Sequence, residues 1–148
     1  MARMAGKVRR EFDAEANVTL RDIDDGAETA DASEAGVALS VLKDAYWDNN
    51  EQPNGIFLVS FHVSAADYAS TDEVYDLYIE VDTASNFPSA KEVARLKSVP
   101  STGYYEVPVS SQLIEALEAG ATHIRVRLDV TGTTPSITYG AWMTYLKV

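Results

Sequence analysis

The sequence predicts an all-β protein, an antiparallel β-sandwich of jelly-roll type with about eight strands and one short helix. Three observations carry this prediction. Apolar residues alternate with polar residues over several long segments, which is typical of half-buried strands. Turn-forming residues separate these segments at intervals of about 10 to 20 residues. Helical spacing of apolar residues is convincing in one segment, residues 110–119.

The clearest strand is residues 122–130. Ile124, Val126 and Leu128 point one way and Arg125 and Arg127 the other, so one face is apolar and the other charged. A Gly-Thr-Thr-Pro turn leads into a second strand, 136–146, which is rich in β-branched and aromatic residues. Strands of this length need a large sheet, which the earlier segments must supply.

The other predicted strands are less uniform. They span residues 18–23, 36–43, 56–64, 74–82, 92–99 and 104–109. Alternation is regular in 56–64 and 74–82, imperfect in 18–23, and weak in 92–99, which indicates an edge strand. The acidic segment 24–34 has few large apolar groups, so we expect an exposed and mobile loop.

The predicted helix lies between two strands. Ser110 or Ser111 can cap it, and Gly120 can end it. Leu113, Ile114 and Leu117 form an apolar stripe. A helix of about two turns is unstable alone, so we expect it to pack on the sheet edge.

Length and charge indicate one domain, residues 14–148, preceded by a basic arm, residues 1–13. The net charge is −11, yet the first ten residues carry four basic groups and no acid, which leaves 8 basic against 23 acidic residues, or −15. The basic groups are Arg3, Lys7, Arg9 and Arg10. A solvated terminus is one interpretation, and an arm that binds an acidic protein surface is the other. An acidic body argues against direct binding of nucleic acid or an anionic membrane.

The spacing of the residues singles out no catalytic or metal-binding pattern. The chain has no cysteine, which fits synthesis in a reducing cytoplasm, and its two histidines, His62 and His123, lie on polar strand faces. We therefore expect no cofactor and no metal. The acids of segment 22–28 do not follow the spacing of a calcium loop, and clustered acids are more often solvated than metal-bound.

Aromatic residues leave alternatives open. Tyr46 and Trp47 either cover one end of the core or form an exposed contact. The remaining tyrosines and Trp142 are core residues, interface residues or a platform on which sugars stack. The last of these predicts a carbohydrate-binding β-sandwich module.

Segments in the second half of the chain carry a family resemblance. They are the strand 75–81, Asn86-Phe87, the run 103–109, and the hairpin 123–142, in which alternating arginines lead through a Gly-Thr turn into a strand that contains Gly140. This arrangement resembles the capsid cement, or decoration, proteins of tailed bacteriophages, the family typified by a Bordetella phage protein. It covers about half of the chain and consists mainly of β-hairpin pattern.

The resemblance implies a jelly-roll structural protein of the virion, made in the host cytoplasm. Such a protein binds the outer capsid surface, bridges neighbouring copies of the major capsid protein and associates with its own copies, without enzymatic activity. We expect the contact to involve Arg3, Lys7, Arg9, Arg10, Tyr46 and Trp47. The alternatives are the carbohydrate-binding module, a tail or baseplate protein of the same fold, and a hydrolase whose acids the spacing does not single out.

Overall fold

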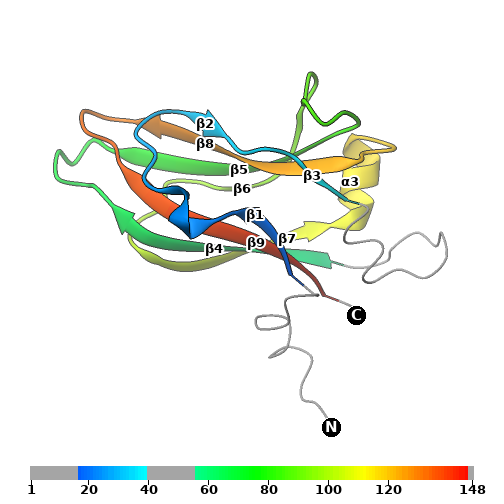
Figure 1. The fold of residues 1–148 in the computed structure, drawn as a ribbon, viewed down its shortest axis with the longest axis horizontal. Coiled ribbons are helices and arrows are strands. Elements are labelled where there is room, and N and C mark those ends of the chain that lie inside the picture. The colour runs from blue at the N-terminus through cyan, green and yellow to red at the C-terminus, as the bar shows by residue number, and fades with distance from the viewer. Residues whose placement is uncertain (1–16, 40–55, 147–148) are drawn as a thin grey trace, which may run out of the picture.

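Two antiparallel sheets pack face to face in a computed structural model, which describes residues 17–39 and 56–146 (Figure 1). Sheet A has the strand order β1-β9-β4-β7, and sheet B has the order β2-β8-β5-β6, with β3 also paired to β8. The elements of sheet A are β1 (Asn17–Arg21), β4 (Ile56–Ala66), β7 (Gly103–Ser110) and β9 (Ile137–Leu146). Those of sheet B are β2 (Ala32–Ser33), β3 (Val37–Ala38), β5 (Val74–Asp82), β6 (Lys91–Leu96) and β8 (His123–Thr131). The 3-10 helix η1 (Ile23–Asp25) and the helix α3 (Ser111–Leu117) complete the described fold.

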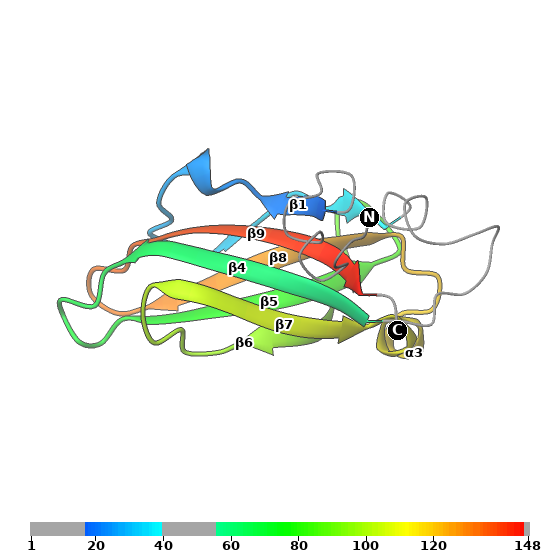
Figure 2. The ribbon, with the colours of Figure 1, turned by 90° about the horizontal axis from the view of Figure 1, so that it is seen from below.

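The strand pairing confirms the jelly-roll prediction. The antiparallel pairs are nested along the chain: β5 with β6 innermost, then β4 with β7, β2 and β3 with β8, and β1 with β9 outermost. Rolling this long hairpin adds the pairs β4 with β9 and β5 with β8. Figure 2 shows the resulting layers, with β9, β4 and β7 in front of β8, β5 and β6. Two layers with four strand positions each, joined by nested pairing, are the features of a jelly roll.

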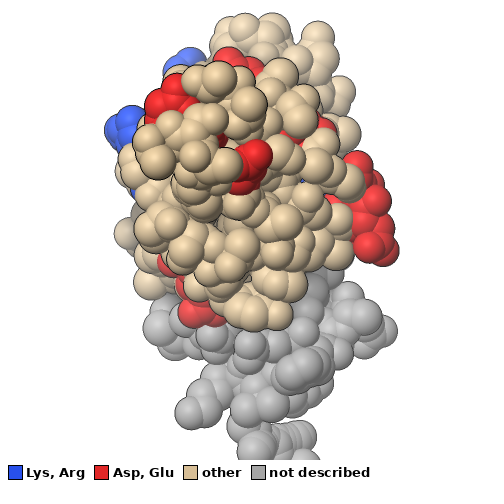
Figure 3. All heavy atoms as spheres, turned by 90° about the vertical axis from the view of Figure 1, so that its left-hand side faces the viewer, with Lys and Arg blue, Asp and Glu red and all other residues tan. Residues whose placement is uncertain are grey.

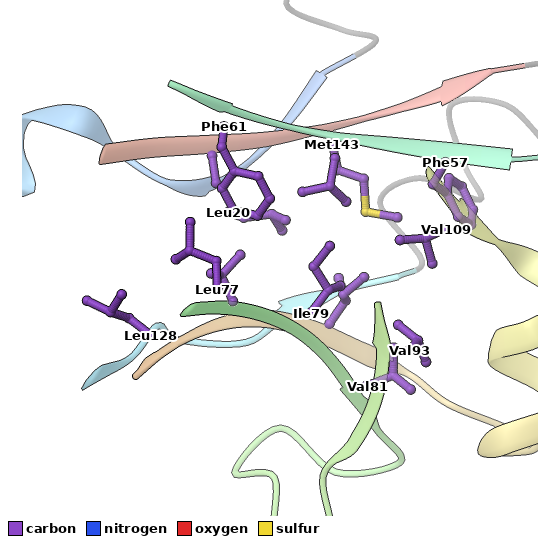
Figure 4. Close-up of a cluster of buried hydrophobic side chains, with 14 of the residues drawn as sticks. Leu20, Phe57, Phe61, Leu77, Ile79, Val81, Val93, Val109, Leu128 and Met143 are labelled. Atoms are coloured by element: carbon purple, nitrogen blue, oxygen red, sulfur yellow. The ribbon is translucent and has the colours of Figure 1, made fainter. Parts of the chain in front are cut away.

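The core lies between the sheets, and the alternating residues supply it as the sequence predicts. Ile124, Val126 and Leu128 of β8 are fully buried, and so are Phe61 and Met143 of sheet A. In Figure 4, Phe61 and Met143 from sheet A and Leu128 from sheet B point into one layer between the sheets. Burying each large apolar side chain contributes about 1.5 to 3 kcal/mol, so this layer is the main source of stability.

The sandwich has two distinct ends, visible at the left and right of Figure 1. We call the left one the loop end, formed by segments 22–31, 67–73, 97–102 and 131–136. The right one, the helix end, carries α3 and the turn 83–90. Strand β7 runs from the loop end at Gly103 to the helix end at Ser110, where α3 begins.

Two predicted strands are shorter in the structure. The strand expected at 18–23 ends at Arg21, where its register against β9 shifts, and Ile23 already belongs to η1. Of the strand expected at 36–43, only Val37 and Ala38 pair with β8, and residues 40–43 lie outside the described part of the chain. A bulge adds a residue to one strand, so it turns the side chains that follow and breaks the alternation.

The acidic segment 24–34 is largely exposed, as its composition predicts, but its backbone is paired with both sheets. Glu28 forms an antiparallel bridge with Ile137, and Ala32 and Ser33 form β2 against β8. The Asp31 carboxylate accepts a hydrogen bond from the backbone N–H of Val130 at 2.8 Å. Backbone pairing and one buried arginine, described below, replace the apolar side chains that the segment lacks.

Candidate interaction surfaces

The predicted contact residues all belong to segments that the structure leaves undescribed. These residues are Arg3, Lys7, Arg9, Arg10, Tyr46 and Trp47. The described residues that flank these segments nevertheless share one end. Asn17 pairs with Thr144, and Ile56 pairs with both Leu146 and Ser110. The backbone N–H of Leu39 bonds to the carbonyl of Thr122, between α3 and β8. Residues 1–16 and 40–55 are therefore both joined to the body at the helix end.

Helix α3 exposes two of the three residues of its predicted stripe. Ser110 caps the helix, and its hydroxyl accepts hydrogen bonds from the backbone N–H groups of Gln112 and Leu113. Ile114 is buried as expected, but Leu113 is 40% exposed and Leu117 is 45% exposed. The helix packs against β6 and β7 as predicted, but its seven residues turn only one narrow side, with Ile114, towards these strands.

Leu113 and Leu117 are four residues apart and so lie on the same side of α3. Ile56, opposite the cap residue Ser110 in the sheet, is 37% exposed. We call these three residues the helix-end patch. They are three of the five large hydrophobic residues that are exposed in the described part of the chain. Exposed large apolar groups gathered at one end mark a contact surface more often than scattered ones do.

The loop end, in contrast, is closed by hydrogen bonds between its own segments. The Tyr75 hydroxyl contacts the carbonyl oxygens of Asp67 and Ser136 at 2.6 and 3.0 Å, and accepts from the Ser136 N–H at 2.9 Å. The buried Glu73 carboxylate accepts from the N–H groups of Ser70 and Thr134. In Figure 3, which faces this end, uncharged residues cover most of the surface and acidic residues appear at separate places.

Gly132 joins the same two loops. Its φ is +114°, and a side-chain carbon at this position would lie 2.7 Å from the Cα of Glu73. Beside it, the Asp72 carboxylate bonds to both the hydroxyl and the N–H of Thr133, and these bonds lower the pKa of Asp72. A glycine is required here both by the backbone angle and by the close approach of the neighbouring loop.

Arg21 holds the acidic segment against the loop end. Its side chain is 2% exposed, and Nη1 lies 2.6 Å from the Glu34 carboxylate. Nη2 donates to the Gly26 carbonyl, and Nε donates to the Tyr139 carbonyl. The guanidinium also lies over the Tyr139 ring, 4.7 Å from its centroid. The imperfect alternation at 18–23 is the sequence signal that could have pointed to this inward arginine.

The outer face of sheet B is occupied by charges that pair with one another. Glu80 accepts from Nε of Arg125 at 3.0 Å and from Nε of Arg127 at 2.8 Å. The two guanidinium groups lie over the rings of Phe87 and Tyr78. Burial alone would lower the pKa of Arg127, but its bonds to Asp129 and Glu80 outweigh burial and raise that pKa. Glu80 lies on the outer face of β5, yet its side chain is buried beneath its partners.

The outer face of sheet A is poor in charge. The strand register shows which described side chains of sheet A point outward. Among them, Glu106 is the only aspartate, glutamate, lysine or arginine. His62 of β4 stacks on Tyr104 of β7, with ring centroids 4.3 Å apart and planes 13° apart. Tyr104 is 73% exposed, whereas Tyr75, Tyr78 and Tyr139 are buried. Of the predicted aromatic platform, the described residues therefore offer one well-exposed tyrosine.

Neither a known protein family nor a curated protein matches this sequence. In residues 17–39 and 56–146, no three histidine or acidic side chains are placed to hold a metal ion, and this includes the acids of segment 22–28. The same residues contain no helix with the length and apolar character needed to cross a membrane.

Proposed function

We propose that this protein is a structural virion protein, which decorates and stabilises the outside of a tailed-phage capsid by bridging neighbouring copies of the major capsid protein. The helix end makes the contact with the shell. The observation that carries this proposal is the helix-end patch, Ile56, Leu113 and Leu117, at the end where both undescribed segments join the body.

The chemistry of this end suits a protein partner. Interface cores are enriched in apolar and aromatic residues and depleted in charge, and a rim of charged groups surrounds them. The patch supplies the apolar part. The sequence of the two segments that join here adds the aromatic pair Tyr46 and Trp47 and the four basic residues of the arm. A basic arm on an acidic protein of net charge −11 favours an acidic partner surface.

Quantitative mass spectrometry of density-purified particles from the source culture tests the role in the virion. A copy number comparable with that of the main shell protein supports head decoration. A few copies per particle support the rival proposal, a tail or baseplate protein of the same fold. Absence from the particles refutes both.

The contribution of the arm is tested by replacing Arg3, Lys7, Arg9 and Arg10 with serine. We expect weaker binding to heads that lack the protein, with a smaller dependence on salt, because exposed charge contacts are screened by ions. The melting temperature stays unchanged. Arg95→Ser is the matched control, since it removes a positive charge from the exposed edge strand β6. Binding equal to that of the original protein removes the arm from the contact.

A further inference from the structure

Tyr104 is placed at an open sheet edge. Strand β7 is the last strand of sheet A, and β4 lies on its one paired side. His62 comes from β4, so it covers the face of the Tyr104 ring that is turned towards the sheet. The opposite face of the ring points past the edge, where no described strand follows. The 73% exposure of the side chain agrees with this placement.

The backbone beside the ring is also directed towards the edge. Pro108 has no N–H, so its pair with Leu58 cannot be one that exchanges two hydrogen bonds. Alternate pairs of an antiparallel ladder are of the same kind, and the register between β4 and β7 is regular. The pair of His62 with Tyr104 is therefore also a non-hydrogen-bonded pair. The N–H and C=O of Tyr104 point away from β4, next to the uncovered ring face.

The surroundings of the ring are polar. Ser64 of β4 and Thr102 of the turn before β7 are both exposed at neighbouring positions. The carboxylate of Glu106 follows two residues along the same face. The exposed leucines lie at the helix end, about 20 Å from Tyr104 by the rise of a β-strand. A protein hot spot is normally enclosed by further apolar contacts. Among the described residues, no other exposed large hydrophobic side chain occupies a register position next to Tyr104.

A flat aromatic face ringed by hydroxyl, carboxylate and backbone polar groups matches a pyranose ring. A gluco-configured pyranose in a β-1,4-linked chain carries only C–H groups on its two faces and its hydroxyls around the rim. The C–H groups fit the electron-rich face of the tyrosine, and the rim hydroxyls fit the polar neighbours. The net charge of −11 and Glu106 disfavour acidic sugars.

We propose that the Tyr104 edge of sheet A binds uncharged β-1,4-linked gluco-configured oligosaccharides, with one sugar stacked on the free face of Tyr104. This goes beyond the proposed function and does not depend on it. The site lies towards the loop end, so it stays accessible when the helix end is docked.

The test is a titration of the full ¹⁵N-labelled chain with cellohexaose and with chitohexaose, followed by NMR chemical shifts. We expect binding of at least one of them with a Kd of about 1 mM or tighter, and shifts centred on Tyr104, His62 and Ser64. Tyr104→Ala weakens the binding at least about tenfold, whereas Tyr104→Phe, which keeps the ring, stays within about twofold. Leu117→Ala, an exposed residue at the other end, is the matched control and has no effect. Polygalacturonate, an acidic chain, does not bind.

Three outcomes overturn the proposal: neither oligosaccharide binds, Tyr104→Ala binds as well as the original protein, or the shifts centre on the helix end. If oligosaccharide binding is absent and Tyr104→Ala instead abolishes self-association, the edge is a contact between copies. Head decoration is measured on particles rather than with sugars, so the two proposals fail independently.

Discussion

At the loop end, side chains from distant segments bond to one another, while at the helix end large apolar side chains face solvent. Tyr75, Glu73 and Arg21 each contact groups from other segments through charged or neutral hydrogen bonds. Leu113 and Leu117 have no comparable cover. The two ends of the sandwich therefore differ in role. The hydrogen bonds at the loop end stabilise the fold, and the exposed apolar residues at the helix end offer a surface to a partner. Substitutions at the two ends should therefore affect different measurements.

The largest effect on stability is expected for Arg21→Ala. Removing one member of a buried ion pair leaves the other charge without its partner, at a cost of about 3 to 5 kcal/mol. Here the change also deprives two backbone carbonyls of their donor. Urea unfolding followed by circular dichroism measures the loss. Arg95→Ala, which breaks an exposed pair with Glu92, should cost less than about 1 kcal/mol. Equal losses in the two variants would show that the buried Arg21 ion pair stabilises the fold no more than an exposed pair does.

Tyr75→Phe should be the next most damaging change. It removes a hydroxyl that contacts two carbonyls and one N–H across three segments, while the buried ring stays in place. The Ser136 carbonyl keeps a bond from the Asp67 N–H, but the loss of the hydroxyl from the Asp67 carbonyl and the Ser136 N–H should cost about 1 to 3 kcal/mol. Tyr104→Phe is the matched control, because its side chain is exposed, and the same urea experiment should show almost no change. A neutral Tyr75→Phe would show that the three segments hold together without this hydroxyl.

A smaller, pH-dependent effect is expected from Asp82 at the helix end. Burial alone would raise its pKa, but hydrogen bonds from the backbone N–H groups of Ser89, Thr83 and Ala84 outweigh burial, so the pKa lies below its ordinary value. Because the carboxylate is favoured in the folded state, its contribution is present above the unfolded-state pKa of about 3.9. It is lost as the pH falls through the lower folded-state pKa.

Urea midpoints measured between about pH 5 and pH 2 test this, since they should fall less steeply in Asp82→Asn than in the original protein. Asp72, whose pKa is also lowered, contributes in the same direction at the loop end. In the double variant Asp72→Asn with Asp82→Asn, the urea midpoint should therefore depend less steeply on pH than in either single variant. Identical slopes in all four proteins would assign acid sensitivity to other carboxylates.

The smallest effect on stability, and the largest on partner binding, is expected for Leu113→Asp with Leu117→Asp. Leu113 and Leu117 are 40% and 45% exposed, so the free energy of unfolding should change by only about 0.5 to 1 kcal/mol for each. Binding to heads that lack the protein should be lost, because charges would replace the apolar contact. Co-sedimentation with the heads measures it. Val74→Asp, an exposed apolar residue at the start of β5, is the control.

The sequence predicted best where side chains obey one simple alternation. Ile124, Val126 and Leu128 are buried as expected, and the turn signals yielded the two layers. It failed where a polar side chain stabilises a segment through a distant partner. Arg21 lies next to Tyr139 only because β1 pairs with β9, and no local pattern reports that pairing. Composition correctly indicated an exposed acidic segment, but it could not indicate that Arg21 holds this segment through Gly26 and Glu34.

The candidate surfaces were predictable to a lesser degree. Helical spacing correctly identified α3, but it could not tell that one leucine side of the helix lacks a sheet to cover it. The tyrosines look alike in sequence, and only the register of each strand separates the buried Tyr75 and Tyr139 from the exposed Tyr104. The predicted contact residues Tyr46 and Trp47 and the four basic arm residues stay a prediction.

The nested pairing has a consequence for biosynthesis. Strands β8 and β9 occupy interior positions of sheets B and A, yet they leave the ribosome after the other seven described strands. Until then β1, β2 and β3 have no partner strand, and only the β4–β7 and β5–β6 pairs can form. Pairing across such long sequence separations is slow, and unpaired strands are prone to aggregate. A chain that terminates before Ile137 lacks an interior strand of sheet A, so premature termination should give an insoluble product rather than a smaller working domain.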